Sequence, residues 1–248
     1  MLTYHNDAQL KQMMVDEMAF HEKADSLIKG TYAEVNGSFK GCAVGCSIES
    51  LNKKLDKQIG HGDHAGMAEA IGWPEWLCRL DDVIFEGLPN DESKSWPSRL
   101  IKAVPIGRDI ERVKWKFFAY IMNENIKRVQ LLGINENLKS EIVSAIRNVL
   151  KLHENIIESG VIDESARSSA RSAESVARSA AESAAWSSES ARSSESAAES
   201  VARSAKSSAR SAEYAAWSSE SSWSSARSAK SSAYKRYADK LIELLGEA

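Results

Sequence analysis

From residue 161 to residue 245 the sequence contains no glycine and no proline, whereas the preceding part holds twelve of the thirteen glycines and all four prolines. Because glycine and proline most often end helices and form turns, a stretch of this length without either favours one long helix. The stretch consists mainly of Ala, Ser, Arg and Glu, with a few Trp residues. We therefore expect a head domain over residues 1–160 and a helical tail over residues 161–248.

Small residues in the tail follow a heptad rhythm, with steps that alternate between four and three residues. This is the spacing of a coiled-coil seam. An alanine seam lets two helix axes approach to the lower end of the roughly 8–10 Å range, although each alanine removes little apolar area from water. The residues that we expect to bind a partner are the seam alanines and three tryptophans that would anchor the contact: Ala202, Ala205, Ala209, Ala212, Ala216, Trp186, Trp217 and Trp223.

The tail sequence also indicates that such a helix needs a partner surface. Serine costs about half a kcal/mol relative to alanine in a helix, and the tail has more than two dozen serines, so the total penalty is on the order of 10 kcal/mol. A straight helix from Asp163 to Leu245 would be roughly 125 Å long, at about 1.5 Å per residue. Since no glycine or proline is available for a hairpin turn, we expect pairing with a second copy or with a helical protein partner.

Two alternatives are a disordered low-complexity segment and an ice-binding Ala/Ser face, but heptad phasing weighs against the first and bulky charged residues interrupt the second.

Overall charge argues against two classes of partner. The net charge is −3 and the isoelectric point is near 6.0, so neither a nucleic acid nor an anionic membrane is expected. No stretch approaches the roughly 20 apolar residues of a membrane span. Three cysteines without a disulfide-rich spacing suit a reducing compartment, and the charged N-terminal stretch lacks the apolar region of a signal peptide. We therefore expect a cytoplasmic protein.

The head sequence predicts helices and an irregular loop. We expect a first helix from Leu10 to about Ile28, an irregular Gly/Cys loop or short hairpin over residues 30–47, and no strand after Ser47. Further helices are predicted to begin at Pro74, Pro97 and Asp109, and at either Asn135 or Asn137. The first of these is expected to end at Gly87, the third before Gly133 and the last at Gly160. Asp81, Asp82 and Glu86 could be ligands, but an amphipathic helix also places such acids on the polar face, and we expect them there, opposite the Leu77, Leu80 and Ile84 stripe. The predicted fold class is all-α: a compact helical head followed by a very long coiled-coil-like helix.

Two cysteines and two histidines in the head have a spacing close to that of a Cys2His2 zinc site, namely Cys42, Cys46, His61 and His64. Thiolates and imidazoles form closed tetrahedral zinc centres, and zinc is the only cofactor that the sequence suggests. The alternatives are that the cysteines are small buried hydrophobic residues in a tight loop beside solvated histidines, or that they form a redox pair or a nucleophilic thiol.

A second candidate cluster lies on the first predicted helix. Glu17, His21 and Asp25 fall four residues apart, so one helix face would present an imidazole beside carboxylates, an arrangement that suits proton transfer and that a solvated helix face also produces. No Walker loop, GxSxG, HExxH or dinucleotide-binding fingerprint occurs in the chain. The sequence therefore lacks the signature of a familiar enzyme class.

Several segments together resemble a set of uncharacterised bacterial and phage proteins. The likeness covers Gly41 to Cys46, the stretch from Trp73 to Asn90, the turn from Val104 to Gly107, and the Ala/Ser/Arg/Trp tail. The resemblance implies that the head and the tail belong together and that Gly41 to Cys46 is a fixed part of the head. It implies no activity, and a phage origin would favour a role in contact with the host.

Two classes of function follow from the sequence. The first is a non-enzymatic helical interaction or scaffold protein that associates through the tail seam while the head supplies specificity. The alternative is a small metal- or thiol-dependent enzyme, or a zinc-stabilised module, in the head, with the tail as an oligomerisation device.

Overall fold

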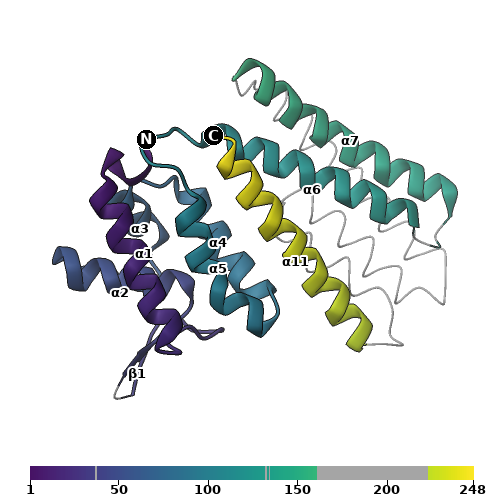
Figure 1. Ribbon diagram of the computed structural model, residues 1–248. Coiled ribbons are helices and arrows are strands. Elements are labelled where there is room, and N and C mark those ends of the chain that lie inside the picture. The colour runs from purple at the N-terminus through teal and green to yellow at the C-terminus, as the bar shows by residue number, and fades with distance from the viewer. Residues whose placement is uncertain (37, 132, 134, 161–222) are drawn as a thin grey trace. The chain divides into compact units, whose positions relative to one another are not determined.

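The computed structural model describes residues 1–36, 38–131, 133, 135–160 and 223–248 (Figure 1). These residues are mostly helical, and their only strands form one short hairpin, which confirms the predicted all-α class. Within the described part of the chain, no helix combines the length and the apolar character needed to cross a membrane. The elements, in chain order, are η1 (Thr3–Asn6), α1 (Ala8–Lys23), β1 (Glu34–Asn36), β2 (Ser38–Lys40), α2 (Ala43–Leu55), α3 (His64–Ile71), α4 (Glu75–Gly87), α5 (Asn90–Ala103), α6 (Glu111–Leu131), α7 (Glu136–Ser159) and α11 (Trp223–Gly246).

The chain divides into two compact units, and the first contains Met1–Lys114 together with Tyr234–Ala248. In this unit α4 packs against α2, α3 and α5, and α5 also packs along α1. The largest fully buried side chains include Trp73, Trp96, Tyr4 and Phe85. Burial of aromatic side chains of this size is the main source of core stability in a small helical unit.

The first helix is shorter than the sequence predicts. It ends at Lys23, and Asp25 has a left-handed backbone with φ of 52°, so the helix cannot run on to Ile28. Leu27 instead forms a parallel bridge with Gly41, because the Ile28 N–H donates to the Gly41 carbonyl at 2.9 Å. The apolar residues after Lys23 thus continue the helical spacing without continuing the helix.

The hairpin predicted in the Gly/Cys region is present, with Val35 opposite Phe39 in an antiparallel register. The second half of that region is helical, however, because α2 begins at Ala43. The expectation of an irregular loop as far as residue 47 was therefore wrong for its last residues.

Helix α5 begins seven residues earlier than predicted. Pro97 lies inside the helix, which starts at Asn90 directly after Pro89 and continues to Ala103. Proline removes one helical hydrogen bond and usually breaks a helix. Here Trp96 and Pro97 are both buried, so packing offsets the lost hydrogen bond.

The second unit runs from Trp115 to Ala233, and its described part comprises most of α6, all of α7 and the start of α11. Helix α7 begins and ends as predicted: the Asn135 side chain accepts a hydrogen bond from the Asn137 N–H at 2.9 Å, and Gly160 ends the helix with a φ of 70°. Helix α6 ends at Leu131, before Gly133, also as predicted. In this unit His153 is buried against the rings of Trp115 and Phe118, at centroid distances of 5.7 and 5.8 Å.

The C-terminal part of α11 belongs to the first unit and packs onto the head. The buried side chains of this part are Tyr234, Tyr237, Ala238, Leu241, Leu244 and Leu245. A helix is thus present from Trp223 to Gly246, while the very long helix predicted for the tail falls mostly on residues outside the described ones and stays a prediction. The boundary predicted near Gly160 stays a prediction.

Candidate functional site

The segment from Gly41 to Cys46 is built around a close backbone contact. A Cβ atom at Gly41 or Gly45 would overlap the carbonyl oxygen of Tyr32, so only glycine allows the chain before the hairpin to lie against the start of α2. The Cys42 N–H donates to the Thr31 carbonyl at 2.8 Å and fixes this approach. The two glycines therefore serve helix packing, where the sequence indicated a loop.

Both cysteines of this segment have structural contacts. The Cys42 sulfur caps α2 by accepting the Gly45 N–H at 3.4 Å, and the Cys46 thiol donates to the Gly41 carbonyl at 3.5 Å. Burial raises the pKa of Cys46 to about 12, and burial together with the Asp82 carboxylate raises the pKa of Cys42 still further. Thiols are reactive as thiolates, so these environments favour inert, packed cysteines at neutral pH.

The two predicted zinc-ligand histidines have different partners. The Nε2 atom of His61 lies 2.9 Å from a Glu49 carboxylate oxygen, whereas the Nε2 atom of His64 lies 3.6 Å from Asp82. The structure thus brings Cys42 and His64 to the same carboxylate and directs His61 to another one. Among the described residues, no group of three or more His, Cys, Asp or Glu side chains could hold a metal ion. The zinc site of Cys42, Cys46, His61 and His64 therefore stays a prediction from their spacing in the sequence, and the described geometry adds no support for it.

Asp82 is the centre of a polar cluster on α4. Its Oδ2 atom accepts the Tyr32 hydroxyl at 3.1 Å, and the Tyr32 ring meets the His64 ring edge to face at 5.9 Å. One helical turn further, the Glu86 carboxylate accepts the Gly30 N–H at 3.0 Å. The chain around Tyr32 is therefore fastened along α4 by carboxylates and covers Cys42, which explains why this thiol is only 1% exposed.

The Glu17, His21 and Asp25 cluster predicted on the first helix does not form. Asp25 lies beyond the end of α1 and pairs with Lys94. The Nε2 atom of His21 instead lies 3.0 Å from the Ser50 hydroxyl, which donates to the Cys46 carbonyl at 3.1 Å. Burial lowers the pKa of His21, which favours the neutral imidazole. This pair links α1 to α2 inside the core.

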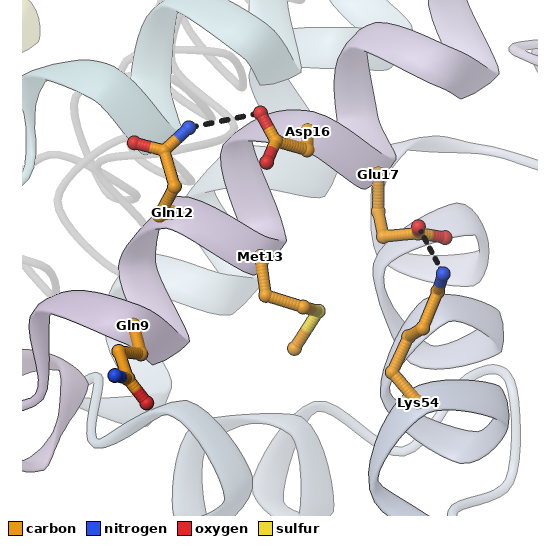
Figure 2. Close-up of a pocket in the computed structure, with 6 residues that line it drawn as sticks. All are labelled: Gln9, Gln12, Met13, Asp16, Glu17 and Lys54. Carbon is orange, nitrogen blue, oxygen red and sulfur yellow. Dashed lines mark hydrogen bonds and ion pairs between the residues drawn. The ribbon is translucent and has the colours of Figure 1, made fainter.

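A pocket of about 440 Å³ lies between α1 and the end of α2 (Figure 2). The Gln12 amide donates to Asp16 at 2.8 Å, and Lys54 forms an ion pair with Glu17 at 2.8 Å, so both carboxylates already have partners. The pocket is open, and Met13 is the one apolar residue among those that line it. Its lining residues are Gln9, Gln12, Met13, Asp16, Glu17 and Lys54.

Asp81 has a role that its position in the sequence did not predict. It was expected on the polar face of its helix, yet its side chain lies in the core and accepts the Trp96 indole N–H at 2.8 Å. The spacing contained the signal: Asp81 follows Leu77 by four residues and precedes Ile84 by three, so it belongs to the apolar stripe. The expectation for Asp81 was therefore wrong.

The candidate interaction surface of the chain lies partly outside the described residues. That holds for Ala202, Ala205, Ala209, Ala212, Ala216, Trp186 and Trp217, while Trp223 is the first residue of α11. What the structure does describe is how the end of the tail meets the head. Lys235 pairs with Glu92 at 2.8 Å, and Arg99 pairs with Asp239 at 2.6 Å.

The docking contact also involves α4. A Cβ atom at Gly87 would overlap the ring of Tyr234, so the aromatic ring rests directly on the glycine backbone.

Comparison of the chain with models of protein families, with curated proteins and with solved structures finds no match in any of the three. The function therefore has to be argued from the geometry described above.

Proposed function

We propose that the chain is a non-enzymatic helical interaction or scaffold protein that self-associates through the small-residue seam of its Ala/Ser-rich segment. The seam is the set of alanines defined above, from Ala202 to Ala216. The alternative occupant of this seam is a helical protein of the host, which a phage origin of the chain would favour.

The observation that carries the proposal is the docking of the C-terminal helix on the head. Tyr234, Leu241 and Leu245 are buried there, and the ion pairs of Lys235 and Asp239 flank them. The segment from residue 161 to 222 thus joins two folded elements, α7 and α11, and is not a free end of the chain.

The physical argument for association comes from the serine content. An isolated helix of this composition is marginal, because serine disfavours helix formation and alanine buries little apolar surface. Helix formation and association along the seam should therefore be coupled, as in coiled coils. Cys42 and Cys46 are buried, and burial raises the pKa of both thiols. These properties support a structural role for the two cysteines in the head.

The test enlarges the seam in the full chain. Ala209→Leu with Ala212→Leu should force the helix axes apart and reduce or change the assembly measured by sedimentation velocity. The matched control places two leucines at the same spacing on two serines, Ser204→Leu with Ser207→Leu, and should leave the assembly unchanged, because the helical period puts these serines on the face opposite the seam. Arg203→Ala should also have little effect, because an exposed charge contributes little.

Circular dichroism of each variant reports whether the helical content is retained. A wild-type chain that sediments as a monomer at all concentrations would contradict self-association, and so would equal assembly of the seam and control variants. If the wild type is monomeric but binds a helical host protein, and the seam variant does not, then the seam is the binding surface and its partner is the host protein and not a second copy of the chain.

A further inference from the structure

The buried carboxyl of Asp81 lies at the contact between α4 and α5. Asp81 is 2% exposed and stands in the apolar stripe of α4. The Trp96 indole N–H, from α5, donates to the Asp81 side chain at 2.8 Å and lies 3.2 Å from the Asp81 carbonyl. A carboxylate held in the core in this way is costly, because a single neutral donor replaces the water that would stabilise its charge.

The titratable groups that face Asp81 cannot offset a negative charge. On α4 itself they are Asp82 and Cys78, and from the N-terminal turn η1 the facing group is Tyr4. Each of these is neutral or negative, whereas α5 contributes the uncharged indole of Trp96. Burial first, and then the charge of Asp82, raise the pKa of Asp81 to about 8. The Asp81 carboxyl therefore keeps its proton at neutral pH and loses it in mildly alkaline solution.

The same two helices hold the C-terminal helix. Gly87, on α4, lies under the ring of Tyr234, and α5 supplies Glu92 and Arg99 to the two ion pairs. Trp96 is four residues after Glu92 and three before Arg99, so it is one helical turn from each of these docking residues. A change in the packing of α5 on α4 at Trp96 thus alters the surface on which Tyr234–Gly246 lies.

We propose that the Asp81–Trp96 contact is a proton-dependent latch between α4 and α5, and that the C-terminal helix loosens from the head when Asp81 gives up its proton. The Asp81 carboxyl accepts the indole N–H in either protonation state, and this bond favours the ionised form, but only the protonated form brings no net charge into the core. The ionised carboxyl adds a second negative charge beside Asp82 in a region without a cation among the groups that face it. This inference concerns the head and its docked helix only, and it is independent of self-association through the seam.

Hydrogen exchange of the full chain, measured by mass spectrometry from pH 6.5 to pH 9, tests the latch. In the wild type, peptides from residues 234–248 should lose about tenfold in protection between pH 7 and pH 9, after correction for the intrinsic exchange rate, because a group with a pKa of about 8 is about 90% ionised at pH 9. Asp81→Asn keeps an acceptor for the indole and cannot ionise, so its protection should stay constant within about twofold. Asp91→Asn, at an exposed acid of α5, is the matched control and should behave like the wild type.

Two results would overturn the latch. One is the same loss of protection in the Asp81→Asn variant as in the wild type. The other is constant protection of residues 234–248 in the wild type from pH 6.5 to pH 9. This second result needs no variant, so it can be obtained even if Asp81→Asn prevents folding.

Discussion

Gly87→Ala should weaken the docking of the C-terminal helix, because the new methyl group would occupy the space of the Tyr234 ring. Gly87 has no left-handed backbone, so the substitution adds no backbone strain and should gain about 0.5–1 kcal/mol of helix propensity. Overpacking of a buried contact costs about 1–3 kcal/mol. We therefore expect the free energy of unfolding to fall by about 1–2 kcal/mol in urea titrations.

A double-mutant cycle separates this contact from any other effect of the methyl group. Tyr234→Ala alone should cost about 3 kcal/mol, since it removes a large buried ring. In that background Gly87→Ala should become neutral or mildly stabilising, which gives a coupling free energy of about 2 kcal/mol. Additive effects of the two substitutions would show that Tyr234 does not rest on Gly87 and would refute the docking geometry.

Three further predictions concern the packing, a helix cap and the pH dependence. Gly45→Ala should destabilise by more than about 2 kcal/mol in chemical denaturation, because the methyl group meets the Tyr32 carbonyl, whereas Gly60→Ala, in open space, should be nearly neutral. Asp56→Gly should stabilise by about 0.5–1 kcal/mol in thermal unfolding, because Asp56 caps α2 with a φ of 50° that glycine adopts without strain. Burial lowers the pKa of His153 from 6.5 to about 4, so the unfolded state binds the extra proton between these values and stability should fall by about 3 kcal/mol from pH 6.5 to pH 4. His153→Leu should flatten this slope in urea titrations at each pH, and an unchanged slope would contradict the buried neutral imidazole.

The helix ends that carry their own local chemistry could be predicted from the sequence. Asn135 accepts a backbone N–H at the start of α7, and Gly160 adopts the left-handed conformation at its end. The end of α4 at Gly87 and of α6 before Gly133 follow the same logic. In each case the signal lies within one turn of the boundary, so no tertiary contact is needed to recognise it.

Features that depend on distant residues could not be predicted in this way. Gly41 and Gly45 indicated a loop, yet they allow the Tyr32 backbone to lie against α2, a contact that only the folded chain creates. Pro97 indicated a helix start, but tertiary burial holds it inside α5. The burial of the leucines near residue 245 against the head was not predicted, and neither were the ion pairs with Glu92 and Arg99, since nothing local marks an ion pair across about 140 residues.

Cys42, Cys46, His61 and His64 have contacts in the structure that their spacing in the sequence does not reveal. Cys42 caps a helix, and His61 pairs with a nearby glutamate. Each residue type has a structural use that the one-dimensional spacing does not distinguish from metal binding.

Zero-length carbodiimide cross-linking of the full chain, with the products identified by mass spectrometry, tests the docking that carries the proposed function most directly. The reagent joins amines to carboxylates that already touch, and the structure places Lys235 Nζ 2.8 Å from Glu92. Lys94 and Asp25, an exposed ion pair within the head, are the internal control. We predict that both pairs cross-link within one chain and that Lys235→Arg removes only the first product. A Lys94–Asp25 product without any Lys235–Glu92 product would contradict the docked C-terminal helix.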